Sequence, residues 1–266
     1  MIANDLNFPI NFEICGHEKE IVSYFGKQGV INQKRKKNNI KNVFVCFTNR
    51  CGSNYLVELL GSTDYFPVGE EFFNWDTVIN NSRIRKINSF DEYCLFLLEK
   101  MRKNNFFISK VSWQQLFMIS KLGQIPNLID SPKFILIKRD NLIDQAISLL
   151  IADQTKAWTS YQSSEKNMIQ YDYQRILLII QKISESNTMF ETYFKLFEAR
   201  YLTLLYEDIY NNPIATIEHI CDFLKITCKH PELKKMRVKK QRNKINQEFK
   251  ERFMYDLKQD FALSFS

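Results

Sequence analysis

The sequence has few of the residues that hold metal ions or crosslink a fold. Its six cysteines form no C-x-x-C pair, and its three histidines are scattered along 266 residues. This spacing gives no zinc-binding pattern, so we expect no metal. In a chain of this length without a secretory signal, we expect the cysteines to be free thiols.

Long apolar runs are also absent. None approaches the roughly 18 residues that span a bilayer, so no transmembrane segment is expected. Residues 1–14 have neither a basic head nor an uninterrupted apolar stretch, which argues against a signal peptide. The default expectation is a cytoplasmic protein.

Glycine and proline are scarce, with seven and six residues. No Pro/Gly-rich linker, internal repeat or low-complexity segment marks a boundary between domains. The hydrophobic fraction of 45% is enough to bury a substantial core. We therefore predict one domain over residues 43–266, preceded by an N-terminal extension over residues 1–42.

The net charge of +7 is concentrated in two segments. Residues 34–41 carry five basic and no acidic side chains, and residues 229–242 carry seven basic side chains against one glutamate. Such segments are either solvated loops or places where an anionic ligand binds. They contain almost no aromatic residues, which argues against a nucleic-acid-binding surface.

Short apolar runs at residues 43–47, 106–108, 134–137 and 202–206 lack strict alternation, as strands buried on both faces do. Apolar residues at helical spacing follow the first three runs. Strand then helix, repeated, predicts an α/β fold of three layers, with a central parallel sheet flanked by helices. Helices are expected around residues 56–60, 116–119, 142–150, 165–198, 213–224 and 247–257.

The first candidate motif is the segment TNRCGSN at residues 48–54, between a predicted strand and a predicted helix. A short glycine-containing turn at that place presents backbone N–H groups and the helix dipole to an anion. It resembles a P-loop in position, but no Lys follows Gly52 as a Walker A motif requires. Arg50 supplies the cation instead and can donate two hydrogen bonds to a phosphate. An ordinary strand-to-helix turn would account for the same residues.

The second candidate motif begins at Arg139, at the carboxyl end of a predicted strand, where open α/β folds bind ligands. Ser148 lies nine residues later in the predicted helix, which Asn141 can cap. A guanidinium and a hydroxyl can converge there on a second phosphate. The alternative is an Arg139 paired with Asp140 or Asp144 and a Ser148 that faces solvent.

The third candidate motif is the run Glu70, Glu71, Phe72 and Phe73. An apolar setting beside the two aromatic rings would raise the pKa of one carboxyl toward that of a general base. The alternative is an acidic surface turn anchored by core phenylalanines.

Taken in this order, these segments resemble the bacterial sulfotransferase family typified by trehalose 2-sulfotransferase. The family's R-S-G-S-T loop corresponds to residues 50–54, its E-F-F motif to 71–73, and its R-x-D-x-x-x-Q-A-x-S segment to 139–148. Its Q-T-x-x-W motif corresponds to residues 154–158. The resemblance runs from about residue 43 to 257 and rests on the order and spacing of the motifs.

The resemblance implies a P-loop-like fold, with 3'-phosphoadenosine-5'-phosphosulfate (PAPS) as sulfuryl donor and a carbohydrate or glycolipid hydroxyl as acceptor. It implies that Arg50 stabilises the leaving phosphate, that Arg139 and Ser148 hold the 3'-phosphate, and that Glu71 is the general base. It also suggests a homodimer. The implied nucleotide-binding residues are Arg50, Cys51, Gly52, Ser53, Asn54, Arg139, Ser148, Lys240 and Arg242, and the implied acceptor-binding residues are Glu70, Phe73, Lys110, Trp113 and Trp158.

The sequence departs from the family pattern at several positions. Cys51 replaces a serine, and Asn54 replaces a threonine, so an amide takes the place of a hydroxyl. Asp140 stands one place earlier than the family's Asp. Val68 stands where the trehalose enzyme has an acid, which argues against trehalose itself as the acceptor.

Two other classes of protein are compatible with parts of the sequence. A nucleotide-dependent kinase would need a P-loop Lys and Mg²⁺ ligands, and the Lys is missing. A nucleic-acid-binding module would need basic and aromatic residues interleaved on one face. The sulfotransferase is therefore the favoured prediction.

Overall fold

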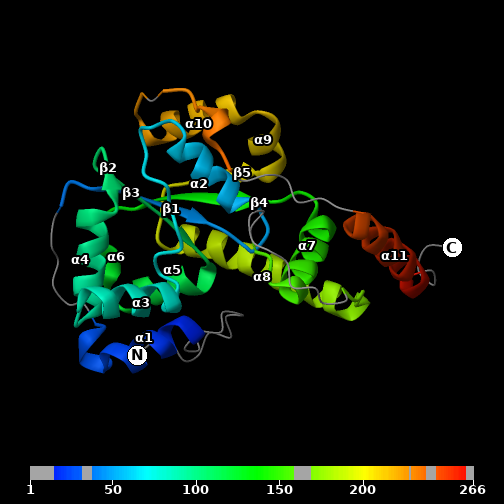
Figure 1. The fold of residues 1–266 in the computed structure, drawn as a ribbon, viewed down its shortest axis with the longest axis horizontal. Coiled ribbons are helices and arrows are strands. Elements are labelled where there is room, and N and C mark those ends of the chain that lie inside the picture. The colour runs from blue at the N-terminus through cyan, green and yellow to red at the C-terminus, as the bar shows by residue number, and fades with distance from the viewer. Residues whose placement is uncertain (1–14, 32–37, 159–168, 228, 238–243, 262–266) are drawn as a thin grey trace.

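The computed structural model describes residues 15–31, 38–158, 169–227, 229–237 and 244–261 (Figure 1). Five strands form one sheet in the order β2-β3-β1-β4-β5. The strands are β1 (Lys41–Cys46), β2 (Arg102–Lys103), β3 (Phe106–Val111), β4 (Lys133–Lys138) and β5 (Tyr201–Leu205).

The sheet is parallel except at one edge. β1 lies between β3 and β4 and is parallel to both, and β4 is parallel to β5. The short β2 runs antiparallel to β3. The four long strands confirm the four predicted from apolar runs, whereas β2, with its two exposed basic residues, was not predicted.

Helices cover both faces of the sheet (Figure 1). Val43 and Val45 of β1 face one hydrophobic cluster, and Phe44 and Cys46 face another. The predicted three-layer α/β fold is thus confirmed. The first cluster includes residues from α2 (Ser53–Gly61), α9 (Tyr206–Asn211) and α10 (Pro213–Leu224), and the second includes residues from α1 (Gly16–Phe25), α3 (Trp75–Arg85), α4 (Phe90–Lys100), α5 (Trp113–Lys121) and α8 (Tyr173–Leu196).

The remaining helices are α6 (Gln124–Asn127), α7 (Leu142–Thr155) and α11 (Lys244–Phe261), with short 3-10 turns at Lys27–Gly29 and Leu233–Lys235. Asn141 caps α7 as predicted, because its side chain accepts a hydrogen bond from the Asp144 N–H. α7, α8 and α11 share a third cluster around the buried Phe253. This packing fixes α7, whose N-terminal half carries Ser148.

The described part of the N-terminal extension packs against the domain. Ile21 of α1 is fully buried and belongs to the same cluster as Phe44. The Cys15 thiol donates to the Gln114 carbonyl at 3.6 Å, and Lys121 of α5 pairs with Glu18 at 2.8 Å. α1 was not predicted, and the domain boundary at residue 42 stays a prediction.

Two further expectations concern cysteines and the membrane. Cys221 is disulfide-bonded, so the expectation of free thiols throughout is wrong at this position. Cys15, Cys46, Cys51 and Cys94 are free. Among the helices of the described ranges, none is long and apolar enough to cross a bilayer.

Candidate active site

The loop between β1 and α2 has the backbone of an anion-binding turn. Arg50 and Gly52 both adopt left-handed backbone conformations, with φ of 66° and 95°. α2 begins at Ser53, and no side chain caps its N-terminus. The first N–H groups of a helix have no partner within the helix, so these donors are available to an anion at the carboxyl end of β1.

Gly52 lies against an aromatic ring. A Cβ atom at this position would lie 2.2 Å from Cδ2 of Tyr206, the first residue of α9. The Arg139 guanidinium also lies over the Tyr206 ring, with its carbon atom 5.0 Å from the ring centroid. Tyr206, which carried no predicted role, therefore fixes both the loop and a cation beside it.

Arg50 contacts both Arg139 and Ser148, and the predicted binding of a phosphate by Arg139 and Ser148 stays a prediction. Arg50 donates from Nε to Ser148 Oγ at 3.0 Å and from Nη1 to the Trp158 carbonyl at 2.7 Å. Arg139 Nη1 is 3.4 Å from the Arg50 carbonyl. Burial lowers the pKa of Arg50, and the neighbouring charge of Arg139 lowers this pKa further.

This cluster fits an anionic group. Arg139 is largely buried, and its Nε has no hydrogen-bond partner. The carboxylate nearest to it belongs to Glu207, at 3.8 Å. A buried donor without a partner is costly, and two adjacent guanidinium groups repel each other. Phosphate groups bound at this cluster would satisfy the donor and neutralise the repulsion.

Gln145 holds the loop to α7. Its side-chain N–H₂ donates to Thr48 Oγ1 at 2.9 Å and to the Asn49 carbonyl at 2.8 Å, and its side chain is fully buried. Gln145 keeps register in the family motif but carried no predicted role. It positions the turn that contains Arg50.

Glu71 is connected through Lys110 to the start of α2, at the end of the same loop. Its Oε1 is 3.3 Å from Lys110 Nζ, and Lys110 Nζ also donates to Asn54 Oδ1, in the first turn of α2. The Lys110 N–H on β3 donates to the Glu70 carbonyl at 2.9 Å, which fixes the acidic segment alongside the sheet. Lys110 is 7% exposed, so the pair is held at a defined place.

His17 from α1 approaches this acid. Its Nδ1 accepts a hydrogen bond from the Trp75 N–H at 3.3 Å. Burial lowers the pKa of His17, and the negative charge of Glu71 partly opposes that shift. His17 lies in the predicted extension, and nothing in its sequence context indicated a place near Glu71.

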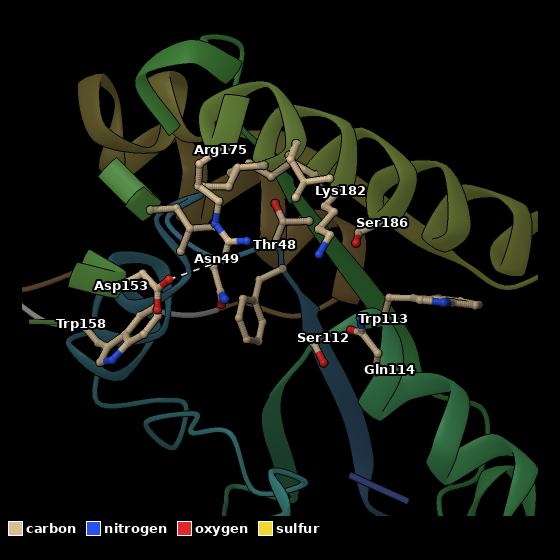
Figure 2. Close-up of a pocket in the computed structure, with 15 residues that line it drawn as sticks. Thr48, Asn49, Ser112, Trp113, Gln114, Asp153, Trp158, Arg175, Lys182 and Ser186 are labelled. Atoms are coloured by element: carbon tan, nitrogen blue, oxygen red, sulfur yellow. Dashed lines mark ion pairs between the residues drawn. The ribbon is translucent and has the colours of Figure 1, made fainter. Parts of the chain in front are cut away.

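The aromatic residues predicted to bind the acceptor lie in two different places. Trp113 and Trp158 line a cavity of about 300 Å³ (Figure 2). Phe73 is fully buried in the core between Phe44 and Phe107 and is not among the residues that line this cavity. The ring of Trp113 also packs edge-on against Phe190.

The remaining predicted residues fall into two groups. Cys51 is fully buried, and burial raises the pKa of its thiol to about 11, so it contributes to the loop through its backbone. Lys240 and Arg242 lie outside the described residues. Within the described ranges, no three His, Cys, Asp or Glu side chains are grouped to hold a metal ion.

Comparisons with known proteins bear on this geometry. A search of solved structures found the sulfotransferase domain from the curacin biosynthetic pathway, at 11% identity and a TM-score of 0.44, which covers 82% of this chain and 99% of that chain. It also found the sulfotransferase domain from the Synechococcus PCC 7002 olefin synthase, at 16% identity and a TM-score of 0.42, with 84% and 99% covered. A sulfotransferase from Alicyclobacillus acidocaldarius has 17% identity and a TM-score of 0.43, with 84% and 95% covered.

A comparison with protein families identifies the family of the chain. No curated protein matched this chain. A family model described as Stf0 sulphotransferase matches residues 42–256, a segment that contains the β1–α2 loop, Glu71 and the Arg139–Ser148 unit. This match favours a sulfotransferase over the kinase and the nucleic-acid-binding module. The chain belongs to the Stf0 sulphotransferase family, for which PAPS is the implied donor.

Proposed function

We propose that this sulfotransferase moves the sulfuryl group of PAPS to a hydroxyl of a carbohydrate or glycolipid, with Glu71 as general base. The observation that carries the proposal is the position of Lys110, which contacts both Glu71 and Asn54. Because Asn54 belongs to the first turn of α2, this contact puts a carboxylate next to the anion-binding loop.

The residues around the loop have complementary roles in this proposal. Arg139 and Ser148 hold the 3'-phosphate, and the N–H groups at the start of α2 face the 5'-phosphosulfate. Arg50 stabilises the negative charge that develops on the leaving phosphate. Gln145 and Tyr206 keep the loop in its place, so that these donors are positioned before the reaction begins.

The chemical step is an in-line displacement. The acceptor oxygen forms a bond to sulfur while the bond from sulfur to the 5'-phosphate oxygen breaks, and the bonding electrons leave with the phosphate. Glu71 takes the proton of the acceptor hydroxyl, which is a poor nucleophile without a base. Lys110 holds the Glu71 carboxylate in place through their 3.3 Å contact and lies where it can stabilise the transferred group.

A transfer assay tests the proposal. Purified protein is incubated with ³⁵S-labelled PAPS and a panel of neutral sugars, sugar acids, glycolipids and phenols, while calorimetry follows binding of adenosine 3',5'-bisphosphate. We expect nucleotide binding and label transfer to members of the carbohydrate panel. Nucleotide binding with transfer only to phenols would overturn the carbohydrate assignment, and absence of nucleotide binding would overturn the site.

A further inference from the structure

The cavity that contains Trp158 is bordered by the carboxyl ends of β1 and β3 and by one side of α7 and α8 (Figure 2). At about 300 Å³ it has the size of a pocket for one small ligand. Phe47, Leu149 and Leu178 give it apolar walls, and Ser112 and Ser186 add hydroxyl groups. This mixture of apolar surface and a few polar groups is typical of a ligand site.

Phe47 and Lys110 connect the cavity to the proposed base. Phe47 forms part of its wall, and Lys110 Nζ lies 5.6 Å from the centroid of the Phe47 ring. The same Nζ is 3.3 Å from Glu71. A ligand in the cavity would therefore lie on the side of the β1–α2 loop where an acceptor hydroxyl can approach Glu71.

The charge of the cavity is positive. Its charged lining residues are Asp153, Arg175 and Lys182. Arg175 is 3.6 Å from Asp153, which is also 3.4 Å from Lys156. The Lys182 ammonium group points into the cavity (Figure 2) and has no ion-pair partner in the part of the chain that the structure describes. Lys182 and Arg175 are seven residues apart on α8 and so share one face of the helix.

From this arrangement we infer that the acceptor carries an anionic group, such as a carboxylate, phosphate or sulfate, that Lys182 binds while the hydroxyl lies at Glu71. The inference rests on the proposed function and adds a substrate class to it. Lys182 is the specificity-determining cation. Arg175 can act as a second cation for the ligand when its ion pair with Asp153 is broken.

Matched acceptors test the inference. Transfer from labelled PAPS is measured to methyl glucoside and methyl glucuronide, to glucose and glucose 6-phosphate, and to 4-hydroxybenzyl alcohol and 4-hydroxybenzoate. We expect the wild-type protein to have the higher kcat/KM for the anionic member of each pair that it accepts. The phenol pair separates the two proposals, because a preference for the anionic phenol without transfer to any sugar would retain this inference and overturn the carbohydrate assignment.

Two variants of the cavity are expected to change KM for anionic acceptors in opposite directions. Lys182→Gln removes the cation and should raise KM for anionic acceptors roughly tenfold, the loss of one hydrogen bond to a charged group, while KM for neutral acceptors stays nearly constant. Asp153→Asn releases Arg175 and should lower KM for the anionic acceptors. Lys195→Gln, an exposed lysine in the last turn of the same helix, is the control and should change neither.

The outcomes against the inference are distinct. It is overturned if the neutral acceptor is preferred in every pair, or if Lys182→Gln affects neutral and anionic acceptors equally. Either result would leave the assignment of PAPS and Glu71 in place. If no acceptor of any pair is sulfated while adenosine 3',5'-bisphosphate binds, the inference fails together with the proposed acceptor class.

Discussion

Glu71 is the acidic side chain that the structure places beside the anion-binding loop, and its proposed role makes a sharp prediction. Glu71→Gln keeps the shape of the side chain and removes the proton acceptor. Turnover should fall by roughly 10²- to 10⁴-fold, the usual contribution of a general base. Calorimetry should show nearly unchanged affinity for adenosine 3',5'-bisphosphate, because the proposed role of Glu71 concerns the acceptor and Lys110 keeps its contact with Asn54.

Glu70→Gln is the matched control. Glu70 contacts β3 through its backbone carbonyl, which accepts from Lys110 and Ser109, and adjacent residues of an extended segment point to opposite sides. Its substitution should therefore have a milder effect on turnover. If Glu70→Gln abolishes transfer while Glu71→Gln retains it, the two roles are exchanged, and if neither matters, the base lies elsewhere.

Arg139 carries the prediction for nucleotide affinity. Its buried Nε lacks a hydrogen-bond partner, and a phosphate would supply one. Arg139→Ala should weaken binding of adenosine 3',5'-bisphosphate by about 1.5–3 kcal/mol, the range for a hydrogen bond to a charged group. Calorimetry measures this change, with Arg85→Ala on the exposed side of α3 as the control. Unchanged affinity in Arg139→Ala would remove it from the nucleotide site.

Some residues of the site can be predicted from sequence and others cannot. Arg139 and Ser148 belong to one strand–helix unit, so their place at the carboxyl edge of the sheet, where both contact Arg50, could be expected from local structure. His17 and Tyr206 reach the site through packing of α1 and α9, which no local pattern encodes. Phe73 shows the converse, since this second aromatic residue after the predicted base packs into the core and does not line the cavity. The sequence identified the acidic–aromatic segment as a motif, but only the three-dimensional packing shows that Glu71 lies beside the loop while Phe73 lies in the core.

At the scale of elements, the contact between the β1–α2 turn and α9 depends on a glycine. Gly52→Ala would place Cβ 2.2 Å from the Tyr206 ring in a left-handed backbone conformation. Overpacking of this kind costs about 1–3 kcal/mol, and the strained φ adds to it. We expect a lower melting temperature and loss of nucleotide binding, measured by thermal denaturation and calorimetry.

Gly16→Ala provides the comparison for this prediction. Gly16 begins α1, and nothing lies within 4 Å of the place that its Cβ would occupy. Replacing it with alanine should be neutral or stabilising by about 0.4–1 kcal/mol, because the unfolded chain loses conformational freedom. Equal destabilisation by both variants would show that contact with Tyr206 is not what makes Gly52 necessary.

The elements themselves differ in how well the sequence predicts them. β1, β3 and β4 are largely buried, and their continuous apolar runs predicted them. β5 was also predicted from an apolar run, but it is an edge strand in which only Leu204 is buried. α10 begins at Pro213 as expected, because proline is favoured in the first turn of a helix. α3 has a polar sequence with few buried residues, and its helical period is correspondingly weak. The two-residue β2 is too short to give any period.

At the scale of the whole molecule, α1 joins the extension to the domain. The family match begins at residue 42, yet Ile21 of α1 is buried in the same cluster as core residues of the sheet. Burial of this kind contributes to the free energy of unfolding of the whole domain. The contacts of Arg139 in the described part of the chain are with Arg50, Glu207 and Tyr206, and none of these residues belongs to α1. The extension is therefore expected to support stability and leave nucleotide affinity unchanged.

Two isoleucines of the extension test this expectation. Ile21→Ala should lower the free energy of unfolding by about 2–5 kcal/mol, the range for a large side chain removed from a core, as measured by denaturant titration. Ile31→Ala is the control, because Ile31 is 53% exposed and its loss should change stability little. Under conditions where Ile21→Ala remains folded, its affinity for adenosine 3',5'-bisphosphate should equal that of the wild type. A weakened affinity in the folded variant, without a comparable change in Ile31→Ala, would show that α1 acts on the nucleotide site through the core.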